Sequence, residues 1–149
     1  MTISIKYHLI KRKDGAERKL PYIPIELHGE KGTLWVETYA LLDSGADISV
    51  IPKDFAELIG VKMDGKPTIA NGLGGEVNVV NSRMNVKMKG DRTTYEFNIP
   101  VQVILDESKI PVLLGRDGFF SYFRIEFDHN NERIRLIKNN VVDFDFKNK

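Results

Sequence analysis

The sequence predicts an all-β protein, a barrel or a sandwich, with one or two short helices. Three observations indicate this class. Apolar and polar residues alternate in most segments, which is the periodicity of strands. Turn signals separate these segments at regular spacing, and no internal repeat occurs. The chain has 149 residues, about the length of one domain, which is enough to bury a core without disulfides.

Charge and composition narrow the class of protein further. The net charge is +1, so we expect neither a nucleic-acid nor a membrane partner. The absence of cysteine excludes disulfides, thiol nucleophiles and cysteine zinc sites, and it is typical of a cytoplasmic protein. Residues 1–10 do not have the pattern of a signal peptide, and no apolar run is long enough to span a membrane.

The sequence gives no sign of a metal site. His8, His28 and His129 are not at the spacing of metal ligands. Residues 128–132 weakly resemble a calcium loop, but Arg133 stands where that loop needs glycine, so we interpret them as a plain turn. We therefore expect no metal and no cofactor.

The first third of the chain is expected to contain strands over residues 3–10, 20–27 and 33–43. Pro21 and Pro24 argue against a central position for the second of these strands. The basic residues at 11–13 and 18–19 flank an Asp-Gly turn, and we interpret them as a solvated hairpin tip rather than a nucleic-acid patch. The third strand ends at Asp43.

The elements that follow are also mainly strands. A short helix is predicted over 53–60, with Phe55, Leu58 and Ile59 on one face. Further strands are predicted over 77–88, 93–105, 110–115, 123–127 and 133–137, with a helical turn over 116–122. The tail 141–146 alternates as an edge strand would, and we hypothesise that it adds to the sheet of a dimer.

The stretch 40–52 holds a carboxylate at a sharp turn between two apolar runs. Asp43, Ser44 and Gly45 lie at its centre. An acid is seldom buried without a partner, and a glycine two residues later allows a tight backbone turn. The tripeptide alone is also a common turn sequence, so its interpretation as an active-site loop depends on two further stretches.

The second stretch is rich in glycine and consists of Asn71, Gly72, Leu73, Gly74 and Gly75. It is a poor dinucleotide site, because that motif needs a later glycine and a following helix, whereas the residues from Val77 on are predicted to form a strand. Two interpretations remain open. The stretch is either a plain hairpin tip or a hairpin that closes over a ligand and offers backbone groups to it.

The third stretch, residues 111–117, is a short apolar strand followed by Gly115, Arg116 and Asp117. A buried strand that ends at a glycine is common and needs no functional explanation. A functional interpretation depends instead on the order of its parts, which is an apolar pair, glycine, Arg-Asp and then a helical turn.

Together, the three stretches resemble the retropepsin-like aspartic proteases in their order and spacing. The resemblance covers roughly residues 33–127, and its specific parts are 42–47 and 113–117. It implies a single retropepsin-like domain over 1–149, with a closed barrel, a flap hairpin and one or two short helices. Ser44 departs from the threonine that is usual in retroviral members.

The two ends of the chain lie outside this resemblance. Residues 1–20 and 139–149 are expected to form dimer-related or peripheral strands.

The resemblance also implies a function and roles for individual residues. Asp43 would be catalytic, and the paired acid would come from Asp43 of a second copy, because the chain has no second Asp-(Ser/Thr)-Gly. Ser44 and Gly45 would support the active-site loop, with Ser44 joining the loops of the two copies. Gly45, Ala46 and Asp47 would contact an extended peptide or an unfolded protein substrate.

The same resemblance assigns the other two stretches. Residues 71–75 would bind the substrate from above as the flap. Gly115 and Arg116 would brace the loop, with Arg116 paired to Asp47; an exposed ion pair of little energetic value is the alternative.

Two other functions stay open at this point. A retropepsin-like dimer with little or no turnover could serve as a peptide-binding or assembly module, since a fold alone does not decide function. An unrelated β-barrel binding protein, whose Asp-Ser-Gly is only a turn, is the third candidate. The intact Asp43 favours the homodimeric aspartic endopeptidase.

Overall fold

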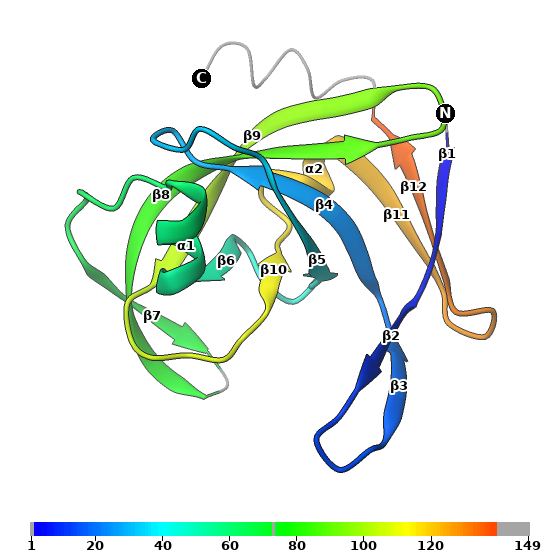
Figure 1. The fold of residues 1–149 in the computed structure, drawn as a ribbon, viewed down its shortest axis with the longest axis horizontal. Helices are drawn as coiled ribbons and strands as arrows, with labels where there is room; N and C mark the ends of the chain where they lie inside the picture. Colours follow the sequence, from blue (N-terminus) through cyan, green and yellow to red (C-terminus); the bar gives the residue numbers. More distant parts are fainter. Residues whose placement is uncertain (1, 73, 140–149) are drawn as a thin grey trace.

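The computed structural model describes residues 2–72 and 74–139, which form mainly strands (Figure 1). The strands are β1 (Thr2–Lys6), β2 (His8–Lys11), β3 (Glu17–Leu20), β4 (Tyr22–His28), β5 (Val36–Leu42), β6 (Ser49–Pro52), β7 (Thr68–Gly72), β8 (Gly75–Lys89), β9 (Thr94–Ile104), β10 (Val112–Leu114), β11 (Phe123–Asp128) and β12 (Arg133–Lys138). The helices are α1 (Lys53–Ile59) and α2 (Phe119–Tyr122). The predicted all-β class with short helices is confirmed.

Six strands form a closed barrel in the order β4–β5–β10–β6–β9–β8, and β8 pairs back to β4. β7 lies outside this ring and pairs with β8 as a hairpin. β10 runs between β5 and β6, parallel to the first and antiparallel to the second. Because Leu114 is level with Leu42 in this register, the ends of β5 and β10 lie side by side. The closed barrel of the prediction is therefore confirmed.

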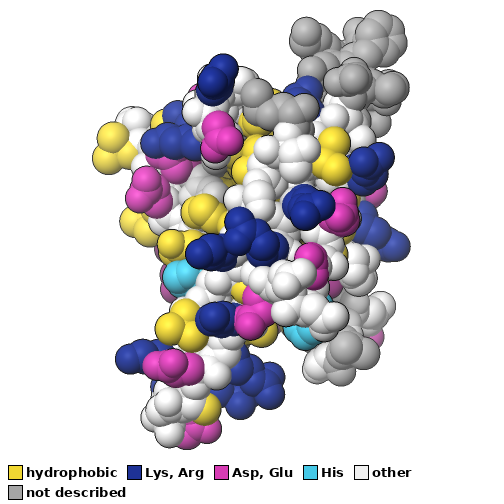
Figure 2. All heavy atoms as spheres, turned by 90° about the vertical axis from the view of Figure 1, so that its right-hand side faces the viewer, with side chains coloured by type: hydrophobic (Ala, Val, Ile, Leu, Met, Phe, Trp, Pro, Cys, Tyr) yellow, Lys and Arg dark blue, Asp and Glu magenta, His cyan; other side chains and the backbone are white. Residues whose placement is uncertain are grey.

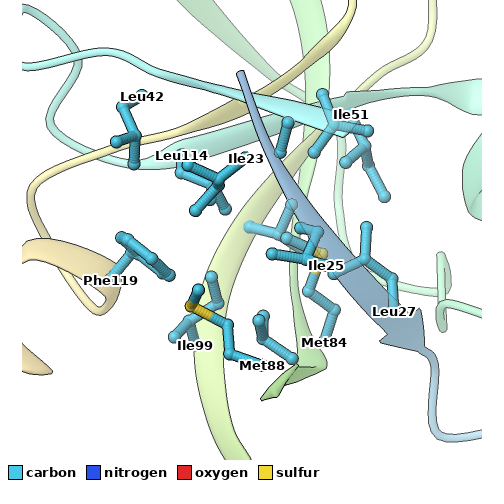
Figure 3. Close-up of a cluster of buried hydrophobic side chains, with 14 of the residues drawn as sticks. Ile23, Ile25, Leu27, Leu42, Ile51, Met84, Met88, Ile99, Leu114 and Phe119 are labelled. Carbon is cyan, nitrogen blue, oxygen red and sulfur yellow. The ribbon is translucent and has the colours of Figure 1, made fainter. Parts of the chain in front are cut away.

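Alternate residues of the barrel strands point into one apolar core. Ile23, Ile25 and Leu27 of β4 are buried, and Figure 3 shows them in one cluster with Met84 of β8 and Ile99 of β9. Burying an apolar side chain of this size contributes about 2 kcal/mol before the loss of chain entropy is subtracted. The barrel is thus held by its interior, and its two ends are free to carry loops.

A second sheet, in the order β1–β12–β11, contributes to the same core. Phe123, Ile134 and Leu136 of this sheet are almost completely buried. The alternation over 3–10 predicts one strand, but the chain changes partner at the buried Tyr7. β1 pairs with β12, whereas β2 pairs with β3. The inward-facing phase also shifts at Tyr7, because Leu9, the next apolar residue in the alternation of the sequence, is 43% exposed.

The β2–β3 hairpin projects from the body of the protein (Figure 1). Among the described strands it pairs with no other, and residues 11–19 are all exposed. Figure 2 shows Lys and Arg side chains gathered at this end of the molecule. The predicted basic hairpin tip is therefore present.

β4 occupies a central position, although its prolines argue against one. It pairs with both β5 and β8. The pairing with β8 involves only residues Glu26–His28, so Pro24 lies where the strand has one neighbour. On the side of β4 that faces away from β5, no strand pairs with Pro24, so a proline there costs no hydrogen bond between strands.

Helix α1 begins directly after Pro52 and ends at Gly60, whose φ of 81° is the left-handed conformation that favours glycine. These bounds agree with the prediction. The predicted apolar face is wrong in one position, because Leu58 is 67% exposed. Ala56 and Ile59 are the residues that α1 buries against the barrel.

Some expectations concern residues outside the described part of the chain. Leu73 and the tail 141–146 belong to this group, so the predicted edge strand in the tail stays a prediction. Over residues 2–72 and 74–139, no helix is long and apolar enough to cross a membrane.

Candidate active site

Asp43 lies directly after β5, in the loop 43–48 that leads into β6. Its backbone N–H donates to the carbonyl of Leu114 on β10 at 3.0 Å. Its carboxylate Oδ1 accepts a hydrogen bond from Gly45 N at 3.0 Å, and its carbonyl accepts one from Ala46 N at 3.3 Å. The side chain is half-buried. The turn therefore presents one carboxylate in a fixed orientation at the end of the barrel.

The end of β10 packs closely against this loop. Gly115 is buried, and a Cβ atom at this position would lie 2.6 Å from the backbone carbon of Ile48. Only glycine fits at that distance without movement of the backbone. The Gly115 N–H donates to the hydroxyl of Ser49 at 3.0 Å, and Ser49 is fully buried. The Ser49 hydroxyl therefore takes the place of a strand carbonyl at the point where β10 leaves β6.

Arg116 and Asp117 continue this contact along the loop. The Arg116 N–H donates to the carbonyl of Ala46 at 2.9 Å, and the Asp117 N–H donates to that of Asp47 at 2.6 Å. The Arg116 guanidinium also pairs with the Asp47 carboxylate. Loop residues 43–47 and residues 115–116, which are far apart in sequence, thus lie side by side.

The glycine-rich stretch forms the tip of the β7–β8 hairpin. Gly72 pairs with Gly75, and Gly75 has a φ of 103° that favours glycine. The described tip residues Asn71, Gly72, Gly74 and Gly75 are exposed. A Cβ added at Gly72 or Gly74 would meet no atom within 4 Å. The predicted hairpin is present, and its described residues make no hydrogen bond to the loop 43–48 within one chain.

Ser44 differs from its neighbours in the loop. Within the described part of the chain its hydroxyl has no hydrogen-bond partner, and its side chain is exposed. Gly45 is exposed as well. The outer side of the loop is therefore open to another molecule.

A surface hollow of about 420 Å³ lies away from the loop 43–48. It is on the outer side of β4, β5 and β8, where Glu26, Glu37, Tyr39 and Lys87 line it, and Asp43 is not among its lining residues. The chemistry of the candidate site therefore depends on the hydrogen-bonded loop and not on this hollow. Among residues 2–72 and 74–139, no cluster of three or more His, Asp or Glu side chains is arranged to hold a metal ion.

Ser49 is the residue of this site that the sequence does not predict. Its surroundings in the chain give no sign of a nucleophile, and Ser-Val-Ile is an ordinary strand sequence. Its contact with Gly115 spans 66 positions of the chain. Local pattern carries no signal for such a bond.

Comparisons with known proteins agree with this geometry. The sequence matches the aspartyl protease family over residues 23–117, and no curated protein sequence matches it. A crystal structure of a retropepsin-like aspartic protease from Rickettsia conorii has a TM-score of 0.53 and 20% identity, covering 91% of this chain and 92% of that chain. EIAV protease complexed with the inhibitor HBY-793 has a TM-score of 0.48 and 23% identity, covering 66% and 83%.

A third similar structure is the retroviral protease-like domain of Ddi1 from Leishmania major, with a TM-score of 0.46 and 20% identity, covering 82% of this chain and 97% of that chain. At these identities the structural likeness concerns the fold alone. The family match, in contrast, spans well over half of the chain. The protein therefore belongs to the aspartyl protease family, and its fold is that of the retropepsin-like members.

Proposed function

We propose that this protein is a homodimeric aspartic endopeptidase in which each subunit contributes Asp43. The observation that carries the proposal is the braced loop 43–48, which holds one half-buried carboxylate at an open end of the barrel. A carboxylate held in one orientation is what general acid–base catalysis of peptide hydrolysis by water needs. The family to which the chain belongs supports the same reaction class.

The need for a second copy follows from the chemistry. Hydrolysis by carboxylates takes one ionised and one protonated acid, and this chain has a single candidate acid in the loop. A two-fold axis beside Asp43 would supply its equivalent from the partner. Two carboxylates in contact share one proton, because they do not both ionise at that distance. The exposed Ser44 hydroxyl would then find its hydrogen-bond partner in the other loop.

The reaction would proceed by acid–base catalysis. The ionised Asp43 takes a proton from water while the water oxygen attacks the scissile carbonyl carbon. The protonated Asp43 donates its proton to the carbonyl oxygen, giving a tetrahedral intermediate. Breakdown cleaves the C–N bond: the nitrogen takes a proton from one of the acids, a hydroxyl of the intermediate returns its proton to the other carboxylate, and a carboxylic acid and an amine leave. The pair ends with one proton, as it began.

The substrate would be an extended peptide or an unfolded protein. It would lie between the Asp43 loops and the β7–β8 hairpins, with its backbone bonded on both sides like an added strand. Gly45, Ala46 and Asp47 would contact it from below and the tip 71–75 from above. Closure of the hairpins would exclude water and strengthen the polar contacts beneath them.

Cleavage of an unstructured protein tests this function. We expect wild-type protein to cleave it at acidic to neutral pH, a pepstatin-type inhibitor to stop cleavage, and Asp43→Asn to abolish it. Asp91→Asn, an exposed acid in the β8–β9 turn, is the matched control and should retain full activity. Peptide binding without cleavage, equal in wild type and Asp43→Asn, would contradict the proposal and favour a binding module.

A further inference from the structure

Strand β8 changes partner at Val79, which is buried and pairs with Thr68 of β7 and with Ile104 of β9. On the barrel side of Val79, β8 pairs with β9 as far as Lys89. On the tip side, its only partner among the described strands is β7. A two-stranded hairpin is only marginally stable in water by itself, so the orientation of the β7–β8 hairpin depends on what holds its root.

The root of the β7–β8 hairpin is held at Asn78. The Asn78 carbonyl accepts a hydrogen bond from the Leu105 N–H at 2.9 Å. The Asn78 N–H donates to Oδ2 of Asp106 at 2.7 Å, and the side-chain amide of Asn78 donates to Oδ1 at 3.3 Å. On the tip side of Val79, no other described residue of the hairpin is hydrogen-bonded to a residue outside β7 and β8.

Asp106 replaces a backbone group at this root. In a regular antiparallel pair, the Asn78 N–H would donate back to the carbonyl of Leu105. It donates instead to the Asp106 carboxylate, and a bond to an ionised acceptor is stronger than one to a neutral carbonyl. Asn78 and Asp106 are both exposed, so these bonds lie outside the barrel core. Loss of the carboxylate would therefore free the root of the hairpin and leave the barrel intact.

We propose that Asp106 is a positioning residue, which orients the β7–β8 hairpin over a bound peptide by holding the backbone of Asn78. The inference rests on the proposed function, in which this hairpin closes over the substrate. The chain that carries Asp106 passes the root of the hairpin and continues into β10 (Figure 1), where the Leu114 carbonyl accepts the N–H of Asp43. One continuous segment, residues 105–114, is thus bonded to both the hairpin and the candidate catalytic loop.

The expected contribution of Asp106 is to substrate binding. A hairpin that is already held in one orientation loses less conformational entropy when a peptide binds than a free hairpin does. Both described hydrogen bonds of the Asp106 carboxylate come from Asn78, so it acts on the substrate through the hairpin and not through Asp43. Asp106 should accordingly lower KM and leave kcat nearly unchanged.

Hydrogen exchange of backbone amides, followed by NMR, tests the hold on the hairpin without any need for activity. Asp106→Ala removes both bonds to the carboxylate and keeps the one from Leu105. We expect the amides of residues 69–71 and 76–78 to exchange about tenfold faster in this variant, because the hairpin opens more often at its root. The amides of residues 84–88, in the barrel part of β8, should exchange as in the wild type.

Two variants separate the carboxylate from its charge and its surroundings. Glu107→Ala is the matched control, because Glu107 is the next acid in the same loop, is exposed, and makes no side-chain hydrogen bond or ion pair with a described residue. It should leave hairpin exchange unchanged. Asp106→Asn keeps an oxygen that accepts from the Asn78 N–H, so it should restore most of the wild-type exchange rate.

Peptide cleavage tests the role in the reaction. Asp106→Ala should raise KM about fivefold and change kcat less than twofold, and Asp106→Asn should bring KM most of the way back. Glu107→Ala should leave both constants unchanged. A residue that only supported the fold would not give this division between KM and kcat, nor its recovery in the amide variant.

The outcomes separate the inference from the proposed function. Hairpin exchange that is unchanged in Asp106→Ala, or that rises equally in residues 84–88, overturns the hold on the hairpin while cleavage by the wild type stands. Faster hairpin exchange with an unchanged KM overturns the role in the reaction. Wild-type protein that cleaves no peptide overturns the proposed function and that role together, and the exchange rates alone then decide whether Asp106 holds the hairpin.

Discussion

The loop 43–48 and the tip of the β7–β8 hairpin both depend on glycine, yet they are built in opposite ways. Gly115 is buried against the loop, so a side chain there would collide with the backbone of Ile48. Gly72 and Gly74 at the hairpin tip face open space. At Gly115 the missing side chain permits close packing of two backbone segments. At Gly72 and Gly74 there is no neighbouring atom for a side chain to meet.

This difference matches what each region would do in the proposed reaction. A carboxylate that activates water must be held in one place, and hydrogen bonds to Leu114 and from Arg116 tie the loop to the end of β10. A lid must open and close, and segments with few contacts and exposed backbone open at low cost in free energy. In the proposed reaction, the braced loop would hold the acid and the exposed hairpin tip would serve as the lid.

The largest expected effect comes from filling the two glycine positions. Gly115→Ala places a methyl group 2.6 Å from a backbone carbon, and we expect a loss of about 3 kcal/mol in the free energy of unfolding. Gly74→Ala should change it by less than about 0.5 kcal/mol, because nothing lies within 4 Å. Urea unfolding measures both. Equal losses of stability for the two variants would contradict the difference in packing between the two regions.

The next effect concerns two serines of the same region. Ser49→Ala leaves the buried N–H of Gly115 without a partner, which should cost about 2 kcal/mol in the free energy of unfolding. Ser44→Ala removes an exposed hydroxyl and should leave the stability of the monomer unchanged, while the dimer dissociates more readily. Thermal unfolding at low protein concentration and sedimentation distinguish these effects. A stable Ser49→Ala monomer would show that the hydroxyl is not needed.

A smaller effect is expected for the ion pair between Asp47 and Arg116. Both side chains are more than half exposed, at 76% and 54%, so screening by water limits the pair to below about 1 kcal/mol. A double-mutant cycle with Asp47→Asn and Arg116→Gln measures it. We expect the variants to lose activity more than stability, because the pair orients the loop. A coupling energy well above about 1 kcal/mol would indicate that the ion pair stabilises the loop more than the hydrogen bond from Arg116 N–H to the loop backbone does.

The smallest expected effect is the change in stability with pH that Tyr7 causes, and Tyr7 lies outside both regions. Burial raises the pKa of Tyr7 above its ordinary value of 10.0, and the carboxylates of Asp128 and Glu132 raise it further. The unfolded chain releases this proton at lower pH than the folded protein does. The stabilisation is therefore complete below pH 10.0 and is lost as the pH rises through the raised pKa.

Tyr7→Phe should accordingly flatten the loss of stability at alkaline pH while leaving stability at neutral pH nearly unchanged. Urea midpoints measured across the alkaline range test this. An unchanged alkaline profile would show that Tyr7 does not titrate as its surroundings indicate. Tyr22, whose pKa is also raised by burial, offers the parallel measurement with Tyr22→Phe.

Much of the fold could be predicted because it depends on local patterns. Alternation locates most strands, and the Pro52 and Gly60 signals bound α1. The loop at Asp43 and its contact with Arg116 are expected from the resemblance to the retropepsin-like proteases. The predictions fail where tertiary contacts decide. Alternation is blind to the change of strand partner at Tyr7, and helical periodicity does not tell which side of α1 meets the barrel at Leu58.

The Ser49 hydroxyl illustrates the same limit at the site. A buried serine in a strand looks like any small residue until the glycine across from it is known. The β2–β3 hairpin is visible in the sequence as a charged hairpin, but its contacts with β5, the hydrogen bond from Leu42 N–H to the Pro21 carbonyl and the stacking of His8 on Tyr39, follow from no sequence pattern. Contacts between segments that are distant in sequence are therefore the part of the site that cannot be predicted without a structure.

Subunit mixing tests the shared active site most directly. Wild-type protein is equilibrated with increasing proportions of Asp43→Asn at constant total concentration, and cleavage of an unstructured protein is measured. If the two subunits share one acid pair, only wild-type pairs are active, and a half-and-half mixture retains about a quarter of the activity. Activity that falls in direct proportion to the wild-type fraction would mean that each subunit acts alone, which contradicts the account.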